Sequence, residues 1–218
     1  MEAKKIYSRR YAPDREFRDA MWRILCRDFF QKLIRRDGPL LEIGAGYCEF
    51  INNIEAVKKT ALDSNPDVKQ FAATDVQAVV GDLSALSKFK PGSYSTVFAS
   101  NLFEHLERPK ILATMRDVLR VLAPGGEFII LQPNIRFCAR DYWMFFDHIT
   151  PIDDRALTEA LEISGFTVRR RIERFLPYTT KSRYPRNPGL VWWYLRIPLA
   201  WRIFGQQSLI LAGKDAGA

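Results

Sequence analysis

The chain has 218 residues, of which 47% are hydrophobic and 27% charged, with a formal net charge of +8. This composition is typical of a globular protein and excludes a disordered or fibrous chain. Its three cysteines, Cys26, Cys48 and Cys138, are far apart, so we expect no disulfide framework, no zinc or other metal site, and a cytoplasmic location. We also expect no secretory signal and no transmembrane helix, because no apolar run follows the basic N-terminus or reaches roughly 18 residues.

Positive charge is concentrated near the carboxyl terminus. Between Phe166 and Lys214 there are ten Lys or Arg residues and one acid, Glu173, which gives this segment a net charge of +9. Such a segment favours an acidic substrate, a membrane surface or nucleic acid as a partner, and a solvated face explains it equally well.

The spacing of the apolar residues predicts an amphipathic helix from Asp14 to Arg36, which Gly38 and Pro39 end. Short apolar runs then alternate with amphipathic segments, a pattern that predicts a parallel sheet flanked by helices. The expected strands are Leu40–Ile43, Thr60–Leu62, Ala78–Val80, Thr96–Ser100 and Glu127–Leu131, followed by a closing pair at Phe166–Ile172 and Ser208–Ala212. The expected helices after the first are Glu49–Ala56, Asp67–Ala73, Pro109–Leu122 and Asp153–Ser164.

A glycine turn follows the first expected strand, in Leu41-Glu42-Ile43-Gly44-Ala45-Gly46. Gly44 and Gly46 lack a Cβ atom, so the backbone can turn tightly and approach a ligand closely. The helix expected at Glu49–Ala56 would offer free N–H groups to a negative group.

Acidic residues lie at the ends of the first three expected strands. They are Glu42, Asp63 and Asp82. Because the carboxyl ends of parallel strands line the crevice where α/β sheets bind ligands, these acids are candidates for one site. Asp63 is suited to accept hydrogen bonds from ribose hydroxyls, but with Ser64 and Asn65 it is also suited to cap the next helix.

Five segments in this order resemble the class I S-adenosylmethionine (SAM) dependent methyltransferases, in the group of small-molecule, type 11/12-like enzymes. They are Leu41-Glu42-Ile43-Gly44-Ala45-Gly46, Ala61-Leu62-Asp63-Ser64-Asn65, Gly81-Asp82-Leu83, the segment from Val97 to Leu106, and the segment from Leu119 to Phe128 with Pro124-Gly125-Gly126. The resemblance covers roughly residues 38 to 134, with a weaker match to about 172. It implies a Rossmann-like α/β fold with a mostly parallel seven-stranded sheet, and S-adenosyl-L-methionine as the cofactor.

The resemblance also implies which residues bind SAM. The methionine part would be bordered by Glu42, Gly44 and Gly46, the ribose held by Asp63 with Ser64 beside it, the adenine bracketed by Asp82 and Leu83, and the site closed by Asn101. The family often has a third glycine where this chain has Cys48, a residue small enough to fit.

Two related classes of enzyme are not favoured. A nicotinamide dehydrogenase with the GxGxxG fingerprint needs a glycine at the position of Glu49. Methyltransferases that act on DNA adenine usually carry a run like NPPY at the fourth strand, where this chain has Asn101-Leu102-Phe103-Glu104. We therefore expect nucleic acid not to be the partner.

The only two histidines, His105 and His148, are the candidate catalytic residues. Methyl transfer to a hydroxyl needs a group that accepts its proton, and imidazole changes its charge near neutral pH. His148 follows the fifth expected strand in an aromatic stretch, where relatives place residues that bind the acceptor. His105 follows the fourth strand near Asn101. Either histidine could instead serve packing or support the SAM pocket.

The stretch from Leu190 to Phe204 combines aromatic residues with Arg196 and Arg202, and Pro198 would interrupt a helix there. It suits an interfacial helix on anionic lipid, a lid over an apolar acceptor, a dimer contact, or a core segment joining the closing strands. We expect a helical cap at residues 1–37, a SAM-binding domain at 38–218, and segments at 135–152 and 176–206 that cover the acceptor.

These features together predict a SAM-dependent methyltransferase that acts on a small-molecule acceptor. The expected target is a hydroxyl of a lipid-linked, sugar-linked or anionic molecule, with peripheral contact to an anionic membrane surface. A protein or RNA methyltransferase and a SAM-binding protein without catalysis are the alternatives. The sequence does not define the oligomeric state.

Overall fold

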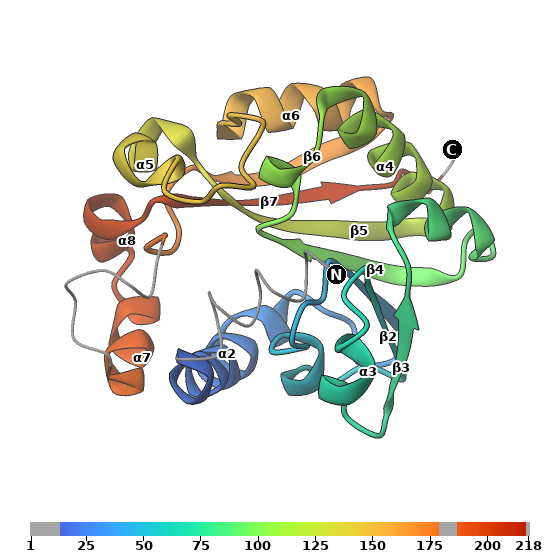
Figure 1. Cartoon of the computed structure of the whole chain (residues 1–218), viewed down its shortest axis with the longest axis horizontal. Helices are drawn as coiled ribbons and strands as arrows, with labels where there is room; N and C mark the ends of the chain where they lie inside the picture. The colour runs from blue at the N-terminus through green and yellow to red at the C-terminus, as the bar shows by residue number, and fades with distance from the viewer. Residues whose placement is uncertain (1–13, 179–186, 217–218) are drawn as a thin grey trace.

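A seven-stranded sheet forms the centre of the molecule in the computed structural model, which describes residues 14–178 and 187–216 (Figure 1). The strand order is β3-β2-β1-β4-β5-β7-β6, and all pairs are parallel except β5 with β7 and β6 with β7. The strands are β1 (Pro39–Ile43), β2 (Lys58–Asp63), β3 (Val76–Val80), β4 (Tyr94–Ser100), β5 (Leu122–Pro133), β6 (Thr167–Ile172) and β7 (Gln207–Gly213). The predicted Rossmann-like fold with a mostly parallel sheet and a closing strand pair is confirmed.

Successive side chains of a strand lie on opposite faces of the sheet, and this alternation explains why helices cover both faces. In β1, Leu40 belongs to one buried cluster and Leu41 and Ile43 to the other. Helices α4 (Arg108–Val121) and α6 (Asp154–Ile163) pack on the face that carries Leu41. Helix α2 (Arg15–Asp28) and the short α3 (Val68–Phe71) pack on the other face, so the two helical layers lie on opposite sides of the sheet (Figure 1). The central strands β1, β4 and β7 are therefore buried on both sides, whereas the edge strands β3 and β6 are partly exposed.

Two predicted helices differ from the structure. The helix expected to reach Arg36 ends at Asp28 and is followed by a 3₁₀ turn, Phe30–Lys32. The helix expected at Glu49–Ala56 is only a 3₁₀ turn, Ile51–Asn53.

Tertiary hydrogen bonds explain the second difference. The Glu42 carboxylate accepts the Ile51 N–H at 3.1 Å, and the Asn52 side chain bonds the backbone of Phe71 and Ala73. The bond to Glu42 takes the Ile51 N–H from its helical i→i−4 partner, and the Asn52 side chain ties the segment to the chain after β2, so the glycine turn is not followed by the helix N-terminus that we expected to face a ligand.

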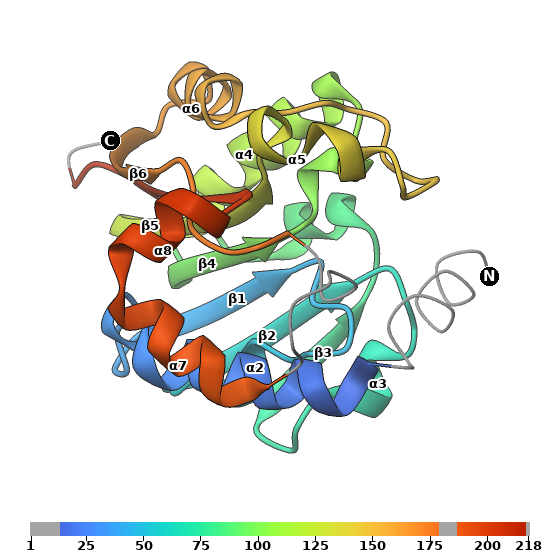
Figure 2. The same cartoon turned by 90° about the vertical axis from the view of Figure 1, so that its left-hand side faces the viewer.

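The segment after β5 forms helix α5 (Ile135–Tyr142), and two more helices, α7 (Pro188–Arg196) and α8 (Pro198–Phe204), connect β6 to β7. As predicted, Pro198 interrupts the helix and starts α8. Helix α7 lies along α2, where Arg196 Nη2 is 3.8 Å from Asp28 Oδ1 (Figure 2). Residues 1–13 of the expected cap and 179–186 of the segment 176–206 lie outside the described residues.

Two further 3₁₀ segments complete the connections, at Leu83–Lys88 after β3 and at Phe103–His105 after β4. Within residues 14–178 and 187–216, no helix has the length and hydropathy needed to cross a membrane.

Candidate active site

The sheet changes direction of winding between β1 and β4, the place where α/β sheets of this kind bind ligands. The glycine turn leaves β1 at this point. Gly44 and Gly46 have φ angles of 69° and 52°, in the left-handed region that favours glycine. The N–H groups of Gly44 and Ala45 donate to the Leu62 carbonyl at the end of β2. The turn is thus held between the ends of two neighbouring strands.

Asp63 fixes the far side of this turn. Its carboxylate accepts the Gly46 N–H and the Asn65 N–H, each at 2.7 Å, and its side chain is buried. Burial raises the pKa of this carboxyl, and the two backbone hydrogen bonds oppose that shift. Asp63 therefore joins the glycine turn to the loop after β2, which carries the exposed Ser64.

Glu42 lies inside the strand and not at its rim. Its side chain is buried, one oxygen accepts the Ile51 N–H, and burial raises the pKa of its carboxyl. These contacts give Glu42 a positioning role for the chain after the glycines. A direct contact between Glu42 and the methionine part of SAM stays a prediction.

The acid after β3 has a different environment. Asp82 is exposed, and hydrogen bonds from the side chain and backbone of Ser84 lower the pKa of its carboxyl. The next residue, Leu83, is buried in the core cluster that includes Ile43 and Leu62. The two residues thus offer a polar and an apolar group at the end of the third strand, which suits an adenine ring.

Asn101 completes the rim at the end of β4. Its φ angle is 50°, its N–H donates to the Leu131 carbonyl, and its Nδ2 donates to Ser100 Oγ at 2.9 Å. Its buried Oδ1 has no hydrogen-bond partner among the residues that the structure describes. A buried amide oxygen that lacks a partner is suited to accept a hydrogen bond from a ligand.

Cys48 has a left-handed backbone conformation of the kind that favours glycine. Its φ angle is 61°, and its side chain is fully buried. We expect the free energy of unfolding of the Cys48→Gly variant to be about 1 kcal/mol higher than that of Cys48→Ala. Both variants lose the thiol, but only glycine relieves the strain of the left-handed conformation. Chemical denaturation of both variants measures this difference, and equal or reversed stabilities would contradict it.

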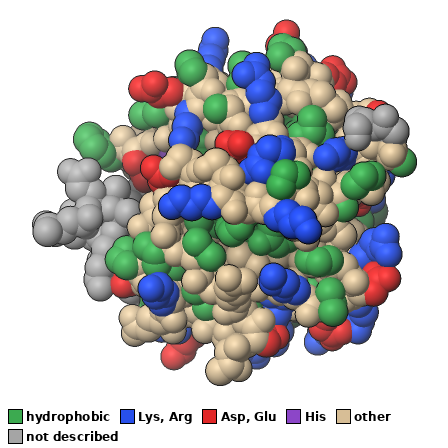
Figure 3. All heavy atoms as spheres, turned by 90° about the vertical axis from the view of Figure 1, so that its right-hand side faces the viewer, with side chains coloured by type: hydrophobic (Ala, Val, Ile, Leu, Met, Phe, Trp, Pro, Cys, Tyr) green, Lys and Arg blue, Asp and Glu red, His purple; other side chains and the backbone are tan. Residues whose placement is uncertain are grey.

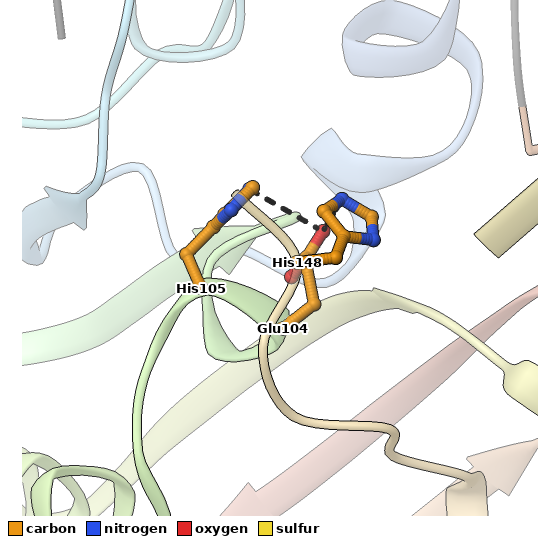
Figure 4. Close-up of side chains that lie close together, drawn as sticks. All are labelled: Glu104, His105 and His148. Carbon is orange, nitrogen blue, oxygen red and sulfur yellow. Dashed lines mark ion pairs between the residues drawn. The ribbon is translucent and has the colours of Figure 1, made fainter. Parts of the chain in front are cut away.

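A second group of polar side chains lies in the loop after β4 and the segment after α5. His105 comes from the first and His148 from the second, and their ring centroids are 4.8 Å apart (Figure 4). Glu104 Oε1 lies 3.9 Å from His105 Nε2 and 4.0 Å from His148 Nε2. Both histidines are catalytic candidates from the sequence, and the structure brings them together.

Hydrogen bonds connect the two segments that carry this group. The N–H groups of Ile149 and Thr150 both donate to the Glu104 carbonyl, and Thr150 Oγ1 donates to the Leu106 carbonyl. Segment 135–152 thus packs against the loop after β4, on the side where the parallel strands end. Its role as a cover over the acceptor stays a prediction.

Sequence reasoning assigned no role to Glu104, although it lies next to His105. Its side chain is 1% exposed, its Oε2 accepts a 2.8 Å hydrogen bond from Gln132 Nε2, and burial raises the pKa of its carboxyl. Asp147 was also missed: its carbonyl lies 3.0 Å from His105 Nδ1. The repeated pair of an acid followed by histidine, in Glu104-His105 and Asp147-His148, was a signal that could have identified both acids.

A glycine turn, an acid at the end of β2 and an amide oxygen without a partner after β4, all at the crossover of a Rossmann-like sheet, are the features expected of the SAM-dependent methyltransferase class. Comparison with known families agrees. The family model described as a methyltransferase domain matches residues 15–171, and the chain belongs to this family. The protein is a SAM-dependent methyltransferase.

Solved structures of methyltransferases are similar in fold. A SAM-dependent methyltransferase of Archaeoglobus fulgidus aligns with a TM-score of 0.67 and 20% identity over 92% of this chain and 97% of that one. A SAM-dependent methyltransferase of Thermotoga maritima gives 0.67 and 15% over 97% and 99%. A chain of the Haloferax volcanii complex between the Trm112 methyltransferase activator and a methyltransferase gives 0.68 and 17% over 94% and 93%. The search of curated proteins by sequence gives no match.

Proposed function

We propose that the enzyme transfers the methyl group of SAM to a hydroxyl oxygen of a small acceptor that is linked to a lipid or a sugar. The observation that carries this proposal is the pair of imidazoles beside the buried Glu104 carboxylate. Transfer to oxygen differs from transfer to an amine, because a hydroxyl must lose its proton to become a good nucleophile. His105 and His148 are the groups suited to accept that proton.

The two histidines have different surroundings. The His105 side chain is 25% exposed, and Asp147 lies against its Nδ1, so its Nε2 is directed toward Glu104. The His148 side chain is 2% exposed, and the Tyr178 hydroxyl lies 3.4 Å from its Nε2. His105 is therefore the histidine that a bound acceptor reaches more easily, and His148 with Tyr178 forms the wall behind it.

An exposed apolar surface on α7 and α8 supports a lipid-linked acceptor. Its side chains are 41% to 64% exposed, and they are Leu190, Trp193, Ile197, Leu199, Ile203 and Phe204. Arg196 and Arg202 lie on the same two helices. Apolar side chains bordered by arginines suit the headgroup region of anionic lipid. On the face turned to the viewer in Figure 3, by contrast, acidic and basic side chains are interspersed.

This surface and the candidate site are close in the fold. Helix α8 ends beside α5, where Gln206 Nε2 donates to the Phe137 carbonyl and the Arg174 guanidinium stacks on the Phe137 ring. Helices α5, α7 and α8 all lie on the left in Figure 1, toward which β5 runs. A membrane touching α7 and α8 would present lipid-linked acceptors on the side where the parallel strands end.

The acceptor proposal is tested with SAM that carries a radioactive methyl group. The enzyme is incubated with fractionated cell extract, which is then separated into organic, aqueous and macromolecular phases. We expect the label in the organic phase or in a sugar-containing aqueous fraction, as a methyl ether stable to mild base. Label in protein or RNA would overturn the proposal in favour of a macromolecular acceptor. No transfer to any fraction, with SAM bound, would favour a binding protein without catalysis.

The membrane contact is tested separately with vesicles. The triple variant Trp193→Ser, Leu199→Ser, Ile203→Ser should bind vesicles of anionic phospholipid at least about tenfold more weakly than the wild type, because three apolar side chains lose their insertion energy. The control variant Val57→Ser, Ile163→Ser changes side chains that are 68% and 62% exposed on other elements. Cosedimentation measures both, and equal binding by the triple variant and the wild type would exclude this surface.

A further inference from the structure

Glu104, His105 and His148 form a group with the composition of a metal site. Their nearest ligand atoms, one carboxylate oxygen and two imidazole nitrogens, all lie within 4.8 Å of one another (Figure 4). Glu104 and His105 belong to the turn after β4, and His148 follows α5. Because hydrogen bonds from Ile149 and Thr150 to the Glu104 carbonyl hold these two segments together, the three side chains keep their relative positions without a ligand.

The surrounding hydrogen bonds orient two of the three groups correctly. His105 Nδ1 faces the Asp147 carbonyl at 3.0 Å, and a carbonyl only accepts, so the ring proton belongs on Nδ1 and the lone pair on Nε2. Glu104 Oε2 accepts from Gln132, which leaves Oε1 directed between the imidazoles. Ligand histidines in metal sites typically donate their other N–H to a carbonyl or carboxylate, and ligand carboxylates are themselves hydrogen-bonded.

The electrostatics of the site call for a cation. Glu104 and His148 have side chains that are 1% and 2% exposed. Within the described part of the chain, the Glu104 carboxylate lies within 4.0 Å of the two imidazoles and forms no ion pair with a Lys or Arg. Burying an ionised carboxylate is costly unless positive charge compensates it. A divalent ion would supply that charge, whereas two neutral imidazoles do not.

We infer that Glu104 Oε1, His105 Nε2 and His148 Nε2 bind a divalent transition-metal ion of the Zn²⁺, Mn²⁺, Fe²⁺ or Co²⁺ type. Imidazole nitrogens favour these ions over Mg²⁺ and Ca²⁺, which take oxygen ligands. Bonds of about 2.0–2.2 Å place neighbouring ligand atoms roughly 3.0–3.5 Å apart. The separations of 3.9 Å and 4.0 Å from the carboxylate oxygen would therefore close by about half an ångström, and the separation of the two imidazole nitrogens, which is within 4.8 Å, by up to about 1.5 Å through side-chain rotation. Tyr178 would then give up its contact with His148 Nε2.

The site deepens the proposed function and rests on it for its catalytic meaning. Three protein ligands leave coordination positions open for the acceptor hydroxyl, and ligation to a divalent ion lowers the pKa of a hydroxyl. The proton leaves to solvent, the oxygen forms a bond to the methyl carbon, and the bond from that carbon to sulfur breaks to give S-adenosylhomocysteine. No group changes oxidation state. With the ion bound, the histidines are its ligands and solvent takes the proton, which in the metal-free enzyme the histidines are suited to accept.

The test uses the full chain without a histidine tag, stripped with a chelator and titrated with Zn²⁺ and Co²⁺ by calorimetry. We expect one ion per chain, and X-ray absorption of the Zn²⁺ form should show two imidazoles. Because the chain has only two histidines, this signature assigns the ion to His105 and His148. His105→Ala, His148→Ala and Glu104→Gln should each weaken binding roughly 100-fold or more. The control, Glu159→Gln, changes an exposed acid on α6 and should bind like the wild type.

SAM affinity and thermal unfolding, measured in the absence of metal, show whether each variant is folded. If the Glu104→Gln variant does not fold, the His105→Ala variant decides whether the metal site exists, because the His105 side chain is only partly buried. Absence of saturable binding, or equal binding by the wild type and the folded variants, would overturn the metal site. Methyl transfer to a hydroxyl that persists in chelator would then leave the proposed function standing. If the ion binds through two imidazoles but no methylated hydroxyl is formed, the metal site is supported and the proposed function is contradicted.

Discussion

Replacing Asp63 with alanine should raise the Kd for SAM on the order of 100-fold. The carboxylate has two tasks: it accepts the Gly46 and Asn65 N–H groups, and it is the group expected to accept hydrogen bonds from the ribose hydroxyls. A hydrogen bond to a charged group contributes about 1.5–3 kcal/mol, so losing the ribose contacts and loosening the glycine turn together account for this factor. Calorimetric titration with SAM and with S-adenosylhomocysteine measures it.

Asp63→Asn and Glu159→Ala are the matched controls. The asparagine keeps one acceptor oxygen and should give an intermediate loss of affinity, whereas Glu159 is exposed on α6 and should have no effect. Because Asp63→Ala leaves two backbone N–H groups without their acceptor, its folding must be verified by circular dichroism. A folded Asp63→Ala protein that binds SAM like the wild type would show that Asp63 only positions the loop.

Replacing His105 or His148 with alanine should lower turnover by roughly 10²–10⁴-fold, the usual contribution of a positioned acid or base. The affinity for SAM should change much less, because the residues expected to bind SAM lie at the ends of β1, β2, β3 and β4. Initial rates with the acceptor identified by radiolabelling, together with calorimetry for SAM, separate the two effects.

Phe145→Ala is a suitable control for His148→Ala. Its ring contacts the His148 ring at a centroid distance of 5.1 Å but has no group that transfers a proton. A loss of turnover in Phe145→Ala as large as in His148→Ala would indicate that packing, and not the imidazole, is what matters. Unchanged turnover in both histidine variants would remove the histidines from the mechanism, and loss of SAM binding would make them supports of the cofactor pocket.

Local pattern predicted most of the sheet and supplied the candidate residues for the SAM site. The apolar runs predicted the central strands, because strands such as β1 and β7 are buried on both faces and are therefore hydrophobic over most of their length. The positions of Gly44, Gly46, Asp63 and Asn101 followed from strand ends and motifs, and the structure places them on one rim. Position relative to a strand end is a local property, so sequence spacing alone suffices to find such residues.

The errors occurred where distant residues provide hydrogen bonds or packing contacts. The segment Glu49–Ala56 has helical spacing, yet Glu42 and the backbone near Phe71 bond it as a short turn. The first helix ends early because Phe29 packs against Phe175, at a ring centroid distance of 4.5 Å. Neither partner is adjacent in sequence, so periodicity could not reveal the competition.

The sequence by itself determined the class of the protein, the order of its strands along the chain and the residues expected around SAM, because turn chemistry and strand burial are written in local residue types. Only the tertiary structure decided that Glu104, His105 and His148 meet, and that α7 lies along α2 with an apolar side exposed. The physical reason is that these contacts depend on how separate loops and helices pack against one another. The packing free energy comes from residue pairs that are far apart in the sequence, so no short stretch of sequence contains both partners.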